Sequence, residues 1–162
     1  MKPILVGIDG SDRSLRALEW ALEEASLRGA RVDVVHVYEP PKPTFAGAMA
    51  AYPPMKSVDE PHRTDQELYE SARRRASDRL TELVGQARDK LGVTVETRSS
   101  VIPDAHPAEV LIDRSKGASL LVLANRGLSP VRGMLLGSVS LHCSQHSRCP
   151  VVIVPEAEEG AD

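Results

Sequence analysis

The 162-residue sequence is poor in aromatic side chains, in excess positive charge and in long apolar runs. Aromatic residues make up 3% of the chain, which leaves few surfaces on which nucleic acid bases could stack. The formal net charge is −3, so no basic field is available to attract nucleic acid or anionic lipid. No apolar run approaches the ~20 residues that cross a bilayer. We therefore expect neither a nucleic acid nor a membrane as a partner.

Cysteine is also scarce, since the chain has only Cys143 and Cys149. Their spacing matches no metal-ligand pattern, and we interpret them as reduced thiols of a cytoplasmic protein. The opening residues, MKPILVGIDGSDRS, lack the apolar stretch and cleavage site of a signal peptide. His142 and His146 are four residues apart, but no third ligand accompanies them, so no metal site is predicted.

Two catalytic motifs are missing as well. No GxxxxGK[ST] loop occurs, which argues against a lysine-based phosphoryl-transfer site, and no GxSxG elbow supports a serine hydrolase. No general base or metal-ligand cluster is evident, so no catalytic residue is assigned. Binding without turnover is favoured, and nucleotide hydrolysis stays open as an alternative.

Apolar runs alternate with amphipathic stretches along most of the chain, as in α/β proteins. Strands are expected at Pro3–Ile8, Val32–Val37, Val93–Val101, Leu120–Leu123 and Val151–Val154. Helices are expected from the Ser11-Asp12 cap to Arg28-Gly29, and over Asp65–Leu91, Pro107–Ser115 and Ser138–His146. The apolar stripe of the second helix comprises Leu68, Ala72, Ala76, Leu80, Leu83 and Ala87. The pattern predicts a five-stranded parallel, doubly wound sheet in one domain, residues 1–155, with an acidic tail at 156–162.

A proline-rich segment interrupts this alternation between residues 39 and 64. Proline lacks the donor that a helix or a central strand needs, so we expect a long insertion loop there. A loop of this length is either functional, for example a lid over a site, or a solvated insertion. Both interpretations stay open, and solvated insertion is favoured.

A glycine-bearing loop follows the fourth expected strand and carries the main functional prediction. It contains Gly127, then nine residues, then Gly137-Ser138 at the start of a helix. Glycine lets the backbone approach an anion, and a helix N-terminus offers unpaired N–H groups and partial positive charge. Asp9 ends the first strand, so it faces the same crevice as Gly127 if these two strands are neighbours. The alternative for Asp9 is a plain helix-capping residue.

Four blocks of the sequence resemble the universal stress protein family. They are ILVGIDGSDRS, VDVVHVYEP, VIPDAHPAEVL and ANRGLSPVRGMLLGSVSLHCSQHSRCPVVIVP, and together they cover nearly the whole chain. The resemblance implies a Rossmann-like fold of the adenine nucleotide alpha hydrolase type, with strand order 3-2-1-4-5. It also implies ATP as ligand, with Mg²⁺ or Mn²⁺ as a candidate ion on the phosphates, and a homodimer formed through Val151–Val154.

The resemblance also implies a role for each site residue. Asp9 would accept hydrogen bonds from the ribose, Gly7 would leave room near the adenine, and Val37 would lie beside the base. The phosphate-binding residues would be Ala124, Arg126, Gly127, Gly137, Ser138 and Val139. For Arg126 and Arg132 the alternative is that of solvated loop arginines.

Two family glycines are replaced in this chain, by Ala124 and by Ala105. If these positions need a negative φ, the extra methyl costs little, whereas a positive φ would cost about 1 kcal/mol or more. The favoured function is therefore that of a cytoplasmic, ATP-binding regulator of the stress response. The alternative is a nucleotide-free dimeric interaction module of the same fold, which Ala124 favours.

Overall fold

The structure is a computed structural model that describes residues 1–41, 62–127 and 135–156. Its elements are β1 (Ile4–Ile8), α1 (Asp12–Arg28), β2 (Val32–Tyr38), α3 (His62–Leu91), β3 (Thr97–Pro103), α4 (Pro107–Ser115), β4 (Leu120–Ala124), α5 (Ser138–His146) and β5 (Val151–Val154). The predicted alternation of strands and helices is confirmed. Most of the proline-rich segment, and the acidic tail beyond Glu156, lie outside the described residues.

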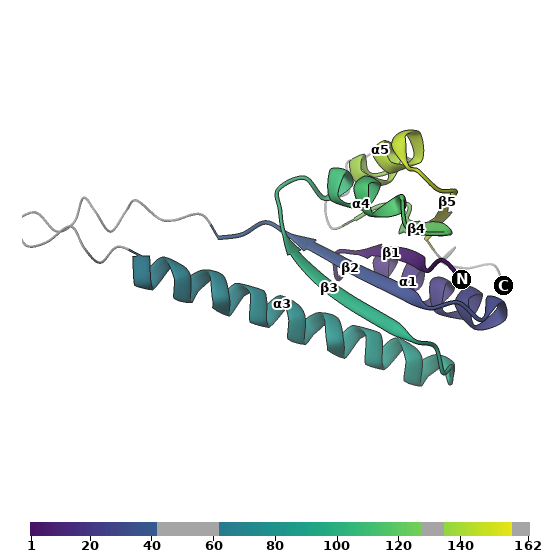
Figure 1. Cartoon of the computed structure of the whole chain (residues 1–162), viewed down its shortest axis with the longest axis horizontal. Coiled ribbons are helices and arrows are strands. Elements are labelled where there is room, and N and C mark those ends of the chain that lie inside the picture. Colours follow the sequence, from purple (N-terminus) through teal and green to yellow (C-terminus); the bar gives the residue numbers. More distant parts are fainter. Residues whose placement is uncertain (42–61, 128–134, 157–162) are drawn as a thin grey trace, which may run out of the picture.

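The five strands form one parallel sheet in the order β3-β2-β1-β4-β5, which confirms the doubly wound α/β fold (Figure 1). The register places Val6 beside Val34 on one side and beside Val122 on the other. The chain therefore winds outward from β1 in both directions, and the topological switch point lies between β1 and β4. Both strands end at the same edge of the sheet, β1 at Ile8 and β4 at Ala124.

Helices cover both faces of the sheet (Figure 1). α1 and α3 pack on one face over the larger of two apolar clusters, which includes Leu18, Leu22 and Val122. α4 and α5 cover the other face over a smaller cluster, which includes Leu121 and Cys143. Alternate residues of the central strands point into opposite clusters, as in strands that are buried on both sides. Within the described part of the chain, no helix has the length and apolarity of a membrane span.

Short-range signals fix where the strands lead into helices. Ser11 is the N-cap of α1, and its hydroxyl accepts the Ser14 N–H at 3.2 Å. Gly29 ends the same helix in the left-handed conformation, with φ of 63°. Pro107 starts α4, where its missing N–H removes no intrahelical bond. The caps at Ser11 and Pro107 place the starts of α1 and α4 near the carboxyl edge of the sheet.

The predicted bounds of the third strand, Val93–Val101, are wrong, because β3 spans Thr97–Pro103. Gly92 ends α3 with φ of 64°, and the Val93 N–H still donates to the Arg88 carbonyl, at 3.3 Å. The residues that follow therefore form the exit from the helix. Pro103 can end the strand because β3 lies at the edge of the sheet, where one row of donors has no neighbouring strand.

α3 starts at His62, three residues before the predicted start, and runs past the end of the sheet (Figure 1). Only the second half of its predicted apolar stripe is buried. Leu80 and Leu83 are almost inaccessible, at 2% and 3%, whereas Leu68 is 40% exposed. The second half of α3 packs against the apolar cluster on the sheet, and the first half extends beyond that cluster.

Candidate functional site

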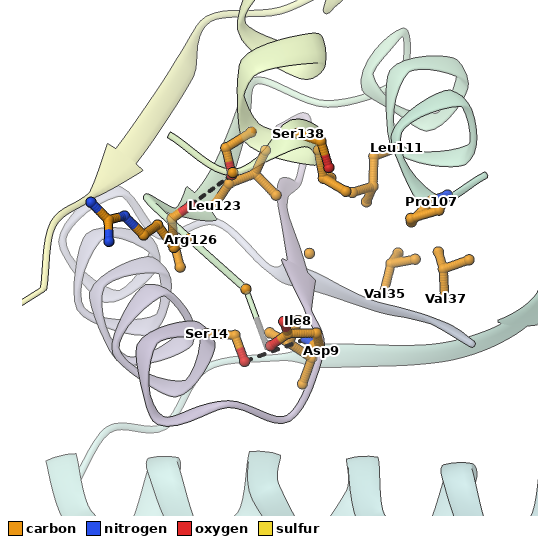
Figure 2. A pocket seen from close by; sticks show the side chains of 16 residues that line it. Ile8, Asp9, Ser14, Val35, Val37, Pro107, Leu111, Leu123, Arg126 and Ser138 are labelled. Atoms are coloured by element: carbon orange, nitrogen blue, oxygen red, sulfur yellow. Dashed lines mark hydrogen bonds between the residues drawn. The ribbon is translucent and has the colours of Figure 1, made fainter. Parts of the chain in front are cut away.

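A cavity of about 280 Å³ opens at the carboxyl edge of the sheet, at the switch point between β1 and β4 (Figure 2). All nine residues predicted as site residues line it: Gly7, Asp9, Val37, Ala124, Arg126, Gly127, Gly137, Ser138 and Val139. Seven further residues that were not predicted complete the lining: Ile8, Ser14, Val35, Pro107, Leu111, Leu123 and Ser140. The topology thus brings residues from the two ends of the chain into one site.

Some of the missed residues had a usable signal in the sequence. Pro107 and Leu111 are four positions apart on one helix, so they share a face. Ser14 follows the N-cap residue Ser11 by three positions, in the first turn of α1. Val35 and Leu123 were expected in buried strands, but nothing in their spacing indicated which of them would reach the cavity.

Asp9 directly follows β1, and hydrogen bonds fix both its backbone and its side chain. Its Oδ1 accepts the backbone N–H and the hydroxyl of Ser11, at 3.0 and 2.6 Å. Its own N–H donates to Ser14 Oγ at 3.3 Å (Figure 2). The N-cap of α1 is Ser11, so the alternative in which Asp9 is the capping residue is wrong. Asp9 instead holds the capping residue and keeps its carboxylate at the cavity.

Gly127 lies against this carboxylate from the other side of the switch point. A Cβ at position 127 would stand 2.5 Å from Asp9 Oδ2, closer than carbon and oxygen can approach. A residue with a side chain would therefore displace the carboxylate or the loop. The close approach of Asp9 and Gly127 is the juxtaposition that the sequence predicted.

α5 begins at the cavity without a side-chain cap. Its N-cap is Gly137, whose N–H donates to the Asn125 carbonyl at 2.7 Å. A Cβ on Gly137 would lie 3.4 Å from Arg126 Cα, so the two glycine-bearing segments are in direct contact. The N–H groups of the first helical turn, which includes Ser138 and Val139, have no intrahelical acceptor and carry partial positive charge. This rim of the cavity suits an anion.

The opposite side of the cavity is apolar. Figure 2 shows Val35 and Val37 from β2 near Pro107 and Leu111 from α4. A Cβ on Gly7 would lie 2.8 Å from Leu123 Cδ2 and 2.9 Å from Leu111 Cδ1. The two leucines therefore occupy the space beside Gly7, where the resemblance predicted room for the adenine. They form an apolar wall against which an uncharged ring can pack.

Ala124 is accommodated without an unusual backbone conformation. It is the last residue of β4, is 7% exposed, and belongs to the apolar cluster shared with α1. Its carbonyl accepts the Ser140 hydroxyl at 2.7 Å, which ties α5 to β4. Because a strand residue has a negative φ, the methyl group adds no strain. Ala105, the other replaced glycine, is exposed in the bend before α4.

Arg126 lies at the outer end of the cavity. Its side chain extends toward α1 and away from Val35 and Val37 (Figure 2). Its Nε is buried, and none of the described residues offers it a hydrogen-bond acceptor. Arg126 as a whole is half-buried, so the alternative of a solvated loop arginine stays open. Arg132 lies outside the described residues.

His142, His146 and Cys143 are not among the residues that line this cavity. The rings of His142 and His146 stack on α5, with centroids 4.5 Å apart. In residues 1–41, 62–127 and 135–156, no three His, Cys, Asp or Glu side chains come together as metal ligands. Burial raises the pKa of the Cys143 thiol to about 11, so it is protonated at neutral pH and packs as an apolar group.

Comparisons with known proteins give one consistent family. The model of the universal stress protein family matches residues 1–155. Universal stress protein YxiE of Bacillus subtilis is 32% identical over 158 residues, which cover 93% of this chain and 97% of that protein. A universal stress protein of Mycolicibacterium smegmatis is 34% identical over 98% of this chain. The chain spans about half of that longer relative, 49% of its length.

Solved structures agree on the fold. UspA from Lactobacillus plantarum superposes with a TM-score of 0.66 at 20% identity, covering 94% of this chain and 97% of that one. A universal stress protein solved in complex with cAMP superposes with a TM-score of 0.61 at 27% identity. That match covers 94% of this chain and 96% of the other.

Proposed function

This chain belongs to the universal stress protein family, and we propose that it binds an adenine nucleotide, ATP, in the cavity between β1 and β4. The observation that carries the proposal is the close approach of the Asp9 carboxylate to Gly127. The carboxylate can accept hydrogen bonds from sugar hydroxyls, and the backbone N–H groups beside it can bind an anion. A sugar next to a phosphate is the chemistry of a nucleotide.

Each side of the cavity has a role in this proposal. Asp9 accepts hydrogen bonds from the ribose hydroxyls, and the base packs among Val35, Val37 and Leu111. The phosphates extend toward Gly127 and Gly137 and the first turn of α5, with Mg²⁺ or Mn²⁺ accompanying them. The relative solved with cAMP supports adenine nucleotides as the ligand class.

The biological part of the proposal is a nucleotide-responsive regulator of the stress response in the cytoplasm. The relatives named universal stress proteins support the stress-related part of this role. No residue is assigned to catalysis, and a steady-state ATP turnover assay separates a binder from a hydrolase. The nucleotide-free module loses its main support, because the Ala124 methyl packs in the apolar core without strain.

We also propose a homodimer through β5. This strand lies at the edge of the sheet, and Val151, Val152 and Ile153 are each only partly buried. An edge strand with an apolar surface is a liability unless another strand pairs with it. Antiparallel pairing with its twin satisfies both copies at once, in the two-fold arrangement that is commonest among oligomers. Pro150 and Pro155 limit the pairing to the four residues between them.

The test of nucleotide binding is Asp9→Ala, measured by calorimetry with ATP. Losing hydrogen bonds to a charged group costs about 1.5–3 kcal/mol, so we expect the affinity to fall by roughly 10- to 100-fold. The matched control is Asp78→Ala, which removes an exposed carboxylate from α3, away from the residues that line the cavity. Mass spectrometry of ligand released from the purified protein gives an independent readout.

The outcomes separate the candidate functions. An Asp9→Ala protein that binds ATP normally but melts earlier would assign Asp9 a purely structural role. A wild-type protein that releases no adenine nucleotide and binds none in the calorimeter would favour the nucleotide-free module.

A further inference from the structure

The carboxylate of Glu156 is held by arginine at the outer end of the site. Glu156 follows β5 by two residues, and Arg13 lies in the first turn of α1. Arg13 Nη2 and Glu156 Oε1 are 2.7 Å apart, and their side chains are 27% and 50% exposed. The hydrogen bond from Arg13 lowers the pKa of the Glu156 carboxyl, and the charges of Arg126 and Arg16 lower it further. Glu156 is therefore an anion in an arginine-rich environment.

The guanidinium groups of Arg13 and Arg126 have N–H donors that the Glu156 carboxylate does not use. The Nε atoms of Arg13 and Arg126 are both buried, and among the described residues neither has a hydrogen-bond acceptor. A guanidinium presents five N–H donors in a fork that fits phosphate as well as carboxylate. Asp9 and Asp12 also act on Arg13 and offset part of its charge, while its guanidinium contacts Glu156 directly.

Arg126, whose charge also acts on Glu156, connects this carboxylate to the cavity. Arg126 lines the cavity, and its side chain extends toward α1 at the end far from the apolar wall (Figure 2). The cavity volume of about 280 Å³ lies just below the range for small-molecule sites, roughly 300–1,000 Å³. In the proposed binding mode the phosphates lie beside Gly127 and Gly137, and Arg126 is the cationic side chain that lines the cavity next to them.

We propose that Arg13 and Arg126 form a second anion subsite, which Glu156 occupies in the free protein and which the terminal phosphate of a nucleoside di- or triphosphate takes over. The inference rests on the proposed nucleotide function. The carboxylate and the phosphate compete for the same donors, so Glu156 weakens phosphate binding and sets a preference by phosphate number.

The test compares Glu156→Gln and Arg13→Gln with the wild type by calorimetry, using adenosine, AMP, ATP and tripolyphosphate. The matched control is Glu96→Gln. It removes a carboxylate from an exposed ion pair with Arg98, which is far from Glu156 and Arg13 in the sequence. Glu156→Gln should bind ATP about three- to ten-fold more tightly and Arg13→Gln correspondingly more weakly, the size of one charge-assisted contact at a partly exposed site. Adenosine should bind all variants equally, and both effects should shrink at high salt.

Other results overturn one or both ideas. If ATP binds the wild type, Glu156→Gln and Arg13→Gln with the same affinity, the subsite is wrong while the nucleotide site stands. Suppose instead that adenosine, AMP and ATP all fail to bind, yet tripolyphosphate binds more tightly to Glu156→Gln. The subsite then stands as a polyphosphate site and the proposed function fails. Failure of all four ligands with every variant refutes both.

Discussion

Replacing Gly127 with alanine tests whether ATP binding depends on the close approach of Gly127 to the Asp9 carboxylate. The added Cβ would stand 2.5 Å from Asp9 Oδ2, so the carboxylate or the loop has to move. The carboxylate is restrained, because its Oδ1 accepts two hydrogen bonds from Ser11. Moving it breaks at least one of them and takes the acceptor away from the ribose. One hydrogen bond to a charged group is worth about 1.5–3 kcal/mol, so ATP affinity should fall by roughly 10- to 100-fold.

The assay is calorimetric titration with ATP, run beside thermal unfolding of the same samples. Gly85→Ala is the matched control, because a Cβ at that position in α3 meets no atom within 4 Å. The control should leave the affinity unchanged and stabilise the protein by about 0.5–1 kcal/mol, since alanine is the better helix former. Gly127→Ala should remain folded, because the clash involves one side chain at the edge of the sheet.

A double-mutant cycle makes the test specific. In an Asp9→Ala background the carboxylate is gone, so adding Gly127→Ala should cost little further affinity. Additive losses would mean that the alanine acts elsewhere in the loop. A folded Gly127→Ala protein that binds ATP as tightly as the wild type would refute the argument altogether.

Three other perturbations follow from the geometry. Gly137→Val puts a branched side chain against the Arg126 backbone, 3.4 Å from the first added carbon, and should abolish ATP binding in a folded protein, measured by calorimetry and circular dichroism. Val152→Lys with Ile153→Glu should turn the proposed dimer into monomer or aggregate, and light scattering that finds the wild type monomeric or the double variant still dimeric contradicts the β5 interface. Burial raises the pKa of the Cys143 thiol in the folded protein to about 11, from an ordinary value of 9.0. The free energy of unfolding should therefore hold below pH 9 and fall by about 1.4 kcal/mol per unit between these values, a slope that urea titrations of Cys143→Ala should lack.

Local chemistry accounts for the elements that the sequence predicted well. Pro107 and Ser115 bound the third predicted helix, and α4 has these same ends. Gly29 was expected to end the first helix, and it does so in a left-handed conformation that glycine adopts at low cost. The strand order came from the family resemblance, because hydrophobic spacing alone does not state which strands are neighbours.

The errors arose where tertiary packing decides. Val93 and Val95 are typical strand residues, yet Val95 is buried in the core without pairing in β3. Leu68 continues a regular apolar stripe, but the sheet that would cover it has already ended. In the site, the Asp9–Gly127 contact followed from the switch-point rule. The pair of Arg13 with Glu156 could not be predicted, since residues so far apart in the chain leave no local pattern.

The pairing of β1 with β4 has a consequence for the order of folding. β1, α1 and β2 are contiguous and can associate through short-range contacts, whereas the β1–β4 register joins Ile4 to Leu120 across most of the chain. Closing so long a loop is slow, so this pairing belongs to the late stages of assembly. The cavity exists only once it has formed. A ligand bound there stabilises the states in which β1 and β4 are paired, so its occupancy reports on the formation of this long-range pairing.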